Sequence, residues 1–218
     1  GIFPAILGTF YLMIGSALVS IPIGIITAIY LTEYAKKPAL VKVIRLGVSN
    51  LAGVPSVVFG LFGLALFVVF LDFGTSIIAG SLTLGVLNLP VIIRSTEETM
   101  RMIPISIREA AFALGTPYYK MIYKILIPVS FSGLATGILL ALSRILGETA
   151  PLMLTALGSP AISFDVTRPV SAVPLLIWDF YNDPNMVSLV WSASLFLMVF
   201  VLSMNLMARS VASKHKYI

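Results

Sequence analysis

The chain contains no cysteine and only one histidine, His215, among its 218 residues. Without cysteine there can be no disulfide bond, no thiolate metal site and no cysteine nucleophile. Because His215 lies in the C-terminal tail, the long apolar segments contain no imidazole that could bind a metal or transfer a proton. The sequence therefore predicts no metal site and no catalytic group of its own.

Charge is also scarce, since only 11% of the residues are charged while 59% are hydrophobic. A soluble domain carries about 25% charged residues, and the mean hydropathy here is +1.05. A transmembrane helix needs about 20 apolar residues. We therefore expect an all-α integral membrane protein in which residues 1–218 form one domain. The predicted transmembrane helices lie near residues 6–31, 50–71, 75–93, 128–150 and 186–208.

The basic residues are distributed unevenly between the predicted loops. Twelve of the fourteen lysines and arginines fall in three segments, namely the first loop, the third loop and the C-terminal tail. They are Lys36, Lys37, Lys42, Arg45, Arg94, Arg101, Arg108, Lys120, Lys124, Arg209, Lys214 and Lys216. Lys/Arg-rich loops remain in the cytoplasm, so these three segments are expected there. The net charge of +5 thus indicates topology and not binding to nucleic acid.

Five helices with a cytoplasmic C-terminus place Gly1 on the outer side of the membrane. The sequence begins without methionine and enters a helix almost at once. We therefore expect an upstream transmembrane helix that is missing from this chain.

One polar segment, residues 105–128, interrupts the apolar sequence. Ser106 and Glu109 have the spacing of a capping box, and Pro104 ends the preceding helix. The following residues Ile107, Ala110, Ala111 and Leu114 form one apolar stripe at helical spacing. Gly115 stands where a helix ends in a left-handed residue. The pattern predicts a short amphipathic helix over 106–114.

A second short helix should follow, with Thr116 as N-cap and Pro117 at its first position, ending at Pro128. The two helices form a cytoplasmic hairpin. On the residues alone, the first helix could lie on the membrane surface or fill a groove on a cytoplasmic partner.

The motif Glu109-Ala110-Ala111, Gly115 and Ile125 to Pro128 resembles the EAA loop of importer-type ABC transporter permeases. That pattern is Glu-Ala-Ala, three residues, Gly, nine residues and Ile-x-Leu-Pro, and Ile127 replaces the Leu here. The resemblance implies a type I (MetI-like) permease core of five transmembrane helices with a cytoplasmic coupling hairpin over 104–128. Glu109, Ala110, Ala111 and Gly115 would then contact a cytoplasmic ATPase subunit.

The chain contains no G-x-x-x-x-G-K-[ST] phosphate-binding loop. The resemblance therefore implies that ATP and Mg²⁺ are bound by two copies of a separate ATPase subunit. It also implies a homologous second permease subunit that forms a heterodimer with this chain, in the cytoplasmic (inner) membrane of a prokaryote.

Three further segments resemble the A-type permease subunits of phosphate-specific (Pst) ABC importers. They are LAGVPSVVFGLFG (51–63), LPVIIRSTEETMRMIP (89–104) and ALSRILGETAPL (141–152). The resemblance covers essentially the whole chain and implies phosphate as substrate, delivered by an extracytoplasmic phosphate-binding protein. Another oxyanion such as sulfate or molybdate remains an alternative. A secondary transporter is a further one, although the internal inverted repeat typical of that class is not evident.

Arg144 and Glu148 are i, i+4 neighbours in an otherwise apolar segment. Charged residues at membrane depth face a bundle interior or an aqueous cavity, and a guanidinium suits a tetrahedral oxyanion because it donates two parallel hydrogen bonds. The pair could therefore line the substrate pathway. It could also be a structural ion pair, and Arg144 could be an interfacial anchor.

A second candidate site of substrate contact lies at the cytoplasmic ends of the predicted second and third helices. Arg94 is expected to end the third helix, while Pro55 interrupts the second next to Ser56. Asn88 and Pro90 perturb the third helix nearby. These residues could form a polar constriction for phosphate, or Arg94 could be a positive-inside anchor beside ordinary glycine-mediated packing.

Overall fold

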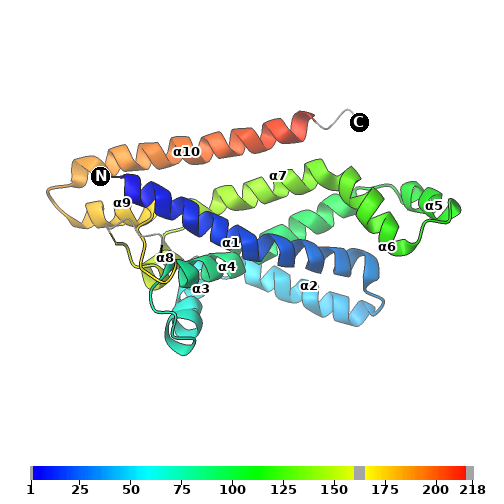
Figure 1. The fold of residues 1–218 in the computed structure, drawn as a ribbon, viewed down its shortest axis with the longest axis horizontal. Helices are drawn as coiled ribbons and strands as arrows, with labels where there is room; N and C mark the ends of the chain where they lie inside the picture. The colour runs from blue at the N-terminus through cyan, green and yellow to red at the C-terminus, as the bar shows by residue number, and fades with distance from the viewer. Residues whose placement is uncertain (1, 160–164, 215–218) are drawn as a thin grey trace.

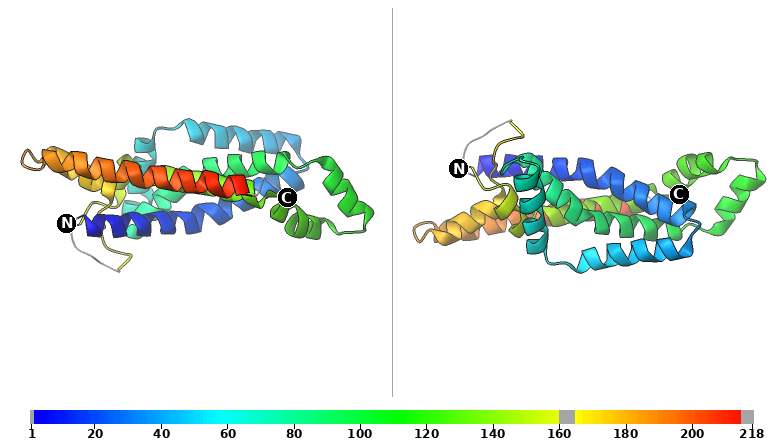
Figure 2. Two further views of the ribbon diagram at one scale, coloured as in Figure 1. Left: turned by 90° about the horizontal axis from the view of Figure 1, so that it is seen from above. Right: turned by 90° about the horizontal axis from the view of Figure 1, so that it is seen from below.

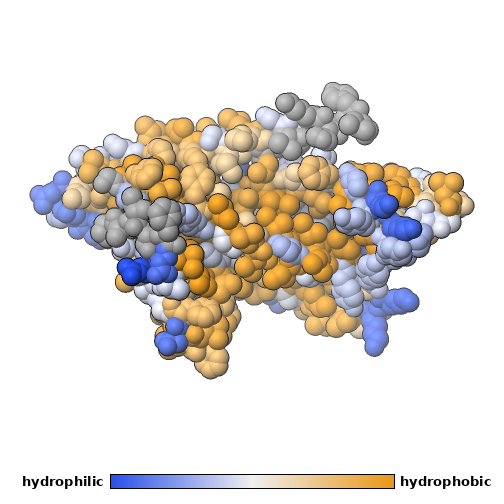
Figure 3. Space-filling model, in the orientation of Figure 1, coloured by the Kyte–Doolittle hydropathy of each residue, from blue (hydrophilic) through white to orange (hydrophobic). Residues whose placement is uncertain are grey.

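The computed structural model describes residues 2–159 and 165–214, and these residues form helices joined by loops (Figure 1). Within them, four helical segments are long and apolar enough to cross a membrane: Phe3–Tyr34, Ile77–Arg101, Tyr118–Ile145 and Val187–Met207. A bent pair, Pro38–Gly53 and Ser56–Phe70, is a further candidate. Hydrophobic side chains cover the middle of the molecule and hydrophilic ones gather toward its two ends (Figure 3). The all-α membrane fold predicted from the sequence is confirmed.

The second predicted helix is not a straight span. Helix α2 (Pro38–Gly53) begins well before residue 50 and stops at Gly53, and α3 (Ser56–Gly63) leaves at 101° to it. Proline lacks an N–H and forces the residue before it out of helical geometry, and Val54 accordingly has φ −73° and ψ 132°. The π-helical η2 (Leu64–Phe70) completes this arm. The prediction of one helix over 50–71 is therefore wrong.

Helix α4 (Ile77–Arg101) lies at the centre of the bundle and is longer than predicted, because it continues past Arg94 and through Pro90. Helix α1 (Phe3–Ile29), extended by the π turn η1 (Tyr30–Tyr34), packs along it in parallel. Gly15 contacts Ser81, and Gly24 contacts Ile92 farther along the same pair. Small residues allow such close approach of helices in lipid.

Six further glycines lie at close contacts between helices. Gly60 lies against Pro151, Gly63 against Thr83 and Gly80 against Leu12. The others contact Ser16 and Val19 (Gly85), Thr99 (Gly133) and Ser95 (Gly137). The last two contacts fix α7 antiparallel to α4.

Pro128 does not break the fourth span. Helix α6 (Tyr118–Met121), the π turn η3 (Ile122–Leu126) and α7 (Ile127–Ile145) form one continuous helical segment. The N–H of Ile127 donates to Ile122, five residues back, so the wider turn lies just before the proline. A proline ring clashes with the carbonyl four residues earlier in a regular helix, and the wider turn leaves room for Pro128.

The end of the bundle away from α6 consists of α8 (Ala150–Thr155), α9 (Val173–Asn182) and the start of α10 (Val187–Lys214). The short helix α9 packs against α1 and α10. Helix α10 runs from that end along α7, whereas α5 (Ile105–Ala113) and α6 extend beyond the other end of the bundle (Figures 1 and 2). We call the end with α8 and α9 the loop end and the end with α5 and α6 the hairpin end. His215 and Lys216 lie outside the described residues.

In the loop between α8 and α9, the side-chain hydroxyl and main-chain N–H of Thr167 both donate to Asp165. These hydrogen bonds hold the pKa of the Asp165 carboxyl below its ordinary value. Arg168 pairs with the same carboxylate at 3.3 Å. Main-chain N–H groups of Ile77 and Ile78 donate to Arg168 and Val166, which fixes this loop on the first turn of α4.

The contact between Gly8 and the loop end gives a test of the packing. A Cβ on Gly8 would overlap the main-chain oxygen of Ser171, whereas one on Gly47 in α2 would meet nothing within 4 Å. Overpacking costs about 1–3 kcal/mol, so Gly8→Ala should lower the melting temperature of the purified protein. The matched control Gly47→Ala should be neutral or up to about 1 kcal/mol stabilising. Equal melting of the two variants would contradict this packing.

Candidate functional site: the coupling hairpin and its arginine contacts

The coupling hairpin begins at Ile105, directly after Pro104, and not at a Ser106 cap. Pro104 has extended ψ of 143°, and no side chain caps the helix, because the proline itself sets the start. The predicted capping box is therefore wrong, and so is Thr116 as N-cap, since Pro117 occupies that position before α6.

Gly115 ends α5 in the left-handed conformation that the sequence predicts, with φ +73°. Its N–H donates to Phe112 and the next N–H, that of Thr116, donates to Ala111. This pair of bonds is the Schellman arrangement, which satisfies carbonyls at a helix end. The turn directs the chain back toward the bundle.

The predicted apolar stripe of α5 divides between two sides. Ala111 is buried and Ile107 packs beside it against Met100, Ile103 and Met121. Ala110 is exposed, and Leu114 is 86% exposed because it lies at the helix end, outside the helical register. Glu109 is exposed too. The hairpin therefore presents Glu109, Ala110, Phe112 and Leu114 beyond the bundle.

Glu33, at the end of η1, is the centre of a partly buried polar cluster beneath the hairpin. Its carboxylate accepts from Arg108 at 2.8 Å, and the two side chains are only 6% and 18% exposed. Tyr118 donates its hydroxyl to the main-chain oxygen of Glu33 and lies 3.3 Å from its carboxylate. Arg108 also donates to the carbonyls of Met100 and Ile103 at the end of α4. We call Glu33, Arg108 and Tyr118 the Glu33 cluster.

A second arginine, Arg45, also contacts both η1 and α4. Arg45 of α2 donates to the carboxylate of Glu97 on α4 and to the carbonyl of Leu31 on η1, both at 3.2 Å. Arg101 lies 4.0 Å from the other oxygen of Glu97. Sequence reasoning missed both clusters, since their partners lie far apart in the chain. The Glu97–Arg101 spacing of four residues was the one local signal.

Arg94 is exposed on the side of α4 and does not end the helix. It lines a cavity of about 210 Å³ together with Arg45, Ser49, Glu97 and Arg101. Ser56 and Asn88 are not among its lining residues. The predicted constriction of Arg94, Ser56 and Asn88 is thus not assembled in this cavity, because the bend after Gly53 carries Ser56 away with α3.

Asn88 is completely buried in α4, and both polar atoms of its side chain lack a hydrogen-bond partner within the described residues. It shares a helix face with Ser81, Gly85 and Ile92, which contact α1. A buried polar group without a partner is costly. Such a residue is a candidate for contact with a substrate or another subunit.

Arg144 and Glu148 form an ion pair, with Arg144 Nε 3.5 Å from Glu148 Oε1. Helix α7 ends at Ile145, so Glu148 lies in the following turn, where its N–H donates to Ile145. The Arg144 side chain is 46% exposed and that of Glu148 15%. The predicted pair is present, with an arginine that protein atoms do not enclose.

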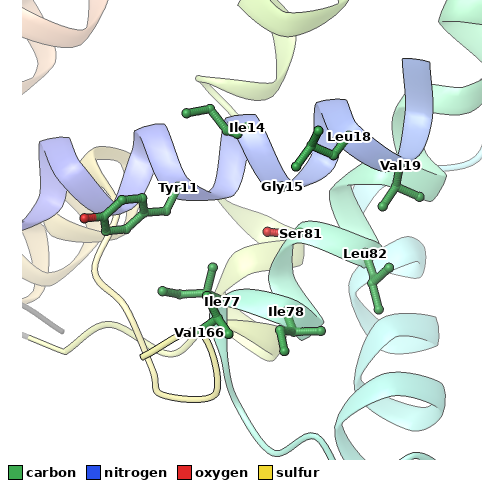
Figure 4. Close-up of a pocket in the computed structure, with 10 residues that line it drawn as sticks. All are labelled: Tyr11, Ile14, Gly15, Leu18, Val19, Ile77, Ile78, Ser81, Leu82 and Val166. Atoms are coloured by element: carbon green, nitrogen blue, oxygen red, sulfur yellow. The ribbon is translucent and has the colours of Figure 1, made fainter. Parts of the chain in front are cut away.

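A hollow of about 450 Å³ lies between α1 and α4 near the loop end, and unlike the cavity beside Arg94 it is lined mainly by apolar side chains (Figure 4). Tyr11, Ile14, Ile77 and Leu82 surround it, and Ser81 carries one hydroxyl there. An apolar hollow of this kind offers an anion no charged donor.

Comparison with known proteins identifies the family to which this chain belongs. The family of binding-protein-dependent transport system inner membrane components matches residues 20–217. The phosphate transport system permease protein PstA of Yersinia pestis is 39% identical, and the alignment covers 100% of this chain and 74% of that protein. The chain belongs to this family and to its PstA-type permeases.

Two further comparisons agree with this assignment. PstA of Mycobacterium leprae is 39% identical over 94% of this chain and 68% of its own. A chain from the inward-facing MetNI methionine ABC transporter superposes with a TM-score of 0.74, covering 99% of this chain and 94% of that one, at 16% identity. The second likeness shows the fold alone. A PstA-type permease is a multi-pass membrane protein that acts in transport, as the sequence predicts.

The left-handed turn at Gly115 can be tested by itself. Nothing lies within 4 Å of a Cβ there, so a substitution acts through the backbone alone. Gly115→Val should cost about 1–3 kcal/mol of local stability because valine resists positive φ, whereas Gly115→Asn tolerates that conformation. Hydrogen exchange should show faster exchange of the Gly115 and Thr116 amides in the valine variant. Unchanged exchange in both variants would contradict the assignment.

Proposed function

We propose that this chain is one permease subunit of an ATP-driven importer that carries inorganic phosphate across the cytoplasmic membrane of a prokaryote. The observation that carries the proposal is the 39% identity, along the whole chain, to proteins named as phosphate transport system permeases. The exposed hairpin at one end and the unpaired polar groups within the bundle support it. The sequence itself contains no group specific for phosphate over other oxyanions.

The energy would come from a partner, because the chain has no phosphate-binding loop for ATP. Two copies of a cytoplasmic ATPase subunit would bind ATP and Mg²⁺. One of them would receive α5 in a surface groove, contacting Glu109, Ala110 and the exposed Phe112 and Leu114. Burial of those apolar side chains gives the hairpin a reason to bind.

The topology follows from the charges. Lys36, Lys37, Lys42 and Arg45 lie at the hairpin end with the EAA segment, so this end and the C-terminus are assigned to the cytoplasm. The loop end, with α8 and α9, would then face an extracytoplasmic phosphate-binding protein. A second, homologous permease subunit would complete the passage beside this one.

Phosphate would meet Arg144 before it reaches Arg94. Ser95 contacts Gly137 across the antiparallel α4 and α7, and Asn88 and Arg144 each lie seven residues farther toward the loop end. At a rise of about 1.5 Å per residue both lie about 10 Å beyond that contact, at a similar depth. The exposed guanidinium of Arg144, oriented by Glu148, can donate two hydrogen bonds to an oxyanion. Asn88 can donate and accept further ones.

The proposal is tested by reconstituting the assembled complex in vesicles and measuring ATP hydrolysis and uptake of radioactive phosphate. We expect phosphate, presented by its binding protein, to stimulate both, with sulfate and molybdate inactive. Glu109→Lys should abolish uptake while this subunit still inserts in the membrane, because charge reversal at the exposed face opposes the ATPase contact. Stimulation by sulfate or molybdate but not phosphate would overturn the substrate assignment.

A double variant distinguishes a substrate contact by Arg144 from a structural role of the Arg144–Glu148 pair. An ion pair with one partner 46% exposed contributes little stability, about 0–1 kcal/mol. Arg144→Gln, and Arg144→Gln with Glu148→Gln, should therefore melt near the wild-type temperature and yet lose uptake. Arg144→Lys should restore uptake only in part, since the planar fork is lost. An active double variant would show that the pair is structural.

A further inference from the structure

Helix α1 is not adjacent to the coupling hairpin in the sequence, yet one of its ends contacts the hairpin. Its other end contacts α9 at the loop end. At the hairpin end stands the Glu33 cluster. At the loop end Thr9 accepts a hydrogen bond from the first N–H of α9, that of Val173, at 3.0 Å. Next to it, Gly8 packs against the main chain of Ser171. A single helix therefore contacts both the EAA segment and α9.

We infer that the Glu33 cluster is the connection through which the hairpin moves α1, and that α1 carries this movement to α9. The inference rests on the proposed coupling role of the hairpin. It makes Glu33, Arg108 and Tyr118 positioning residues. Through the chain itself, the hairpin is joined only to α4 and to α7.

The geometry of Arg108 suits this role. Its Nη2 binds Glu33 of η1 at 2.8 Å and the Met100 carbonyl at 3.2 Å, while Nη1 binds the Ile103 carbonyl at 3.0 Å. One guanidinium on α5 therefore holds the ends of both α1 and α4. A planar fork fixed at three acceptors transmits orientation as well as position.

An aromatic contact reinforces the connection. The ring of Tyr118 stacks on Phe112 of α5, with centroids 5.9 Å apart, and meets Tyr34 of η1 edge-on at 5.3 Å. Its hydroxyl also binds Glu33. The hairpin thus contacts the end of α1 through a buried ion pair and through packed rings, and neither contact depends on solvent-exposed charge.

Helix α1 can transmit movement because it is fixed along its length. Leu12, Gly15 and Gly24 contact Gly80, Ser81 and Ile92 of α4 in parallel order. Close-packed helices shift as units and do not deform continuously. Displacement at Glu33 therefore reaches Thr9, and by reciprocity a ligand acting on α9 changes the hairpin.

The test uses the assembled complex in vesicles, with ATP hydrolysis measured with and without the phosphate-loaded binding protein. Removing both charges, Glu33→Gln with Arg108→Gln, avoids leaving a buried charge unpaired. Coupling energies of ordinary size correspond to about 5- to 150-fold effects, so stimulation and uptake per ATP should fall about tenfold or more. Basal hydrolysis and copurification of the ATPase should stay unchanged, whereas the melting temperature should fall modestly because the Arg108 hydrogen bonds to the Met100 and Ile103 carbonyls are lost.

Three further variants make the result specific. Tyr118→Phe keeps the rings and removes one hydrogen bond, and Thr9→Val removes the bond at the other end of α1. Both should lower stimulation with little effect on melting. Lys37→Gln removes an exposed charge that forms no side-chain hydrogen bond or ion pair within residues 2–159 and 165–214, and it should behave as wild type. Wild-type stimulation in the double charge variant would overturn the inference, and so would loss confined to assembly.

A distance measurement separates this inference from the proposed function. The chain has no cysteine, so spin labels can be placed at Lys120→Cys on α6 and Ile26→Cys on α1. Adding ATP to the complex should leave their distance distribution narrow and unchanged in the wild type, and broaden it in the double charge variant. A change in the wild-type distance would overturn the connection. Failure of phosphate uptake in the wild type, with this distance preserved, would overturn the proposed function alone.

Discussion

The close parallel packing of α1 on α4 is the constraint on which the rest of the structure depends. In lipid, burial of apolar surface does not drive helices together, so packing and polar contacts must do so. Glycine and serine at the contact points let the two backbones approach. The pair then forms a fixed reference: α7 packs antiparallel on α4, α3 crosses it, and the loop before α9 closes over its first turn.

Two ion pairs at the hairpin end, one largely buried and one partly exposed, complete this framework. Arg45 of α2 binds one acidic side chain and one main-chain carbonyl, that of Leu31. Arg108 of α5 binds one acidic side chain and two main-chain carbonyls at the end of α4. Carbonyls at helix ends lack partners within the helix, and the guanidinium groups satisfy several of them. The result is an end of the bundle that is rigid and polar, next to an exposed helix that can bind a partner.

Local sequence patterns predicted the membrane fold and the left-handed Gly115, because composition sets the first and the residue's own backbone sets the second. Helix boundaries were predicted less well. Pro55 broke a predicted span, whereas Pro90 and Pro128 did not break theirs, since a proline's effect depends on the neighbouring turn. The Arg144–Glu148 pair was visible as an i, i+4 spacing. The contact between Glu33 and Arg108 was not, because 75 residues separate them.

The central proposal is that α1, α4 and the coupling hairpin form one body that reaches from the hairpin end to the loop end. It is tested most directly by electron microscopy of the assembled complex with and without bound nucleotide. The account predicts that α1, α4 and α5 superpose together in the two states, with the Arg108–Glu33 contact kept, while they shift relative to the second permease subunit. A hairpin that moves while α1 stays in place, with that contact broken, would contradict it.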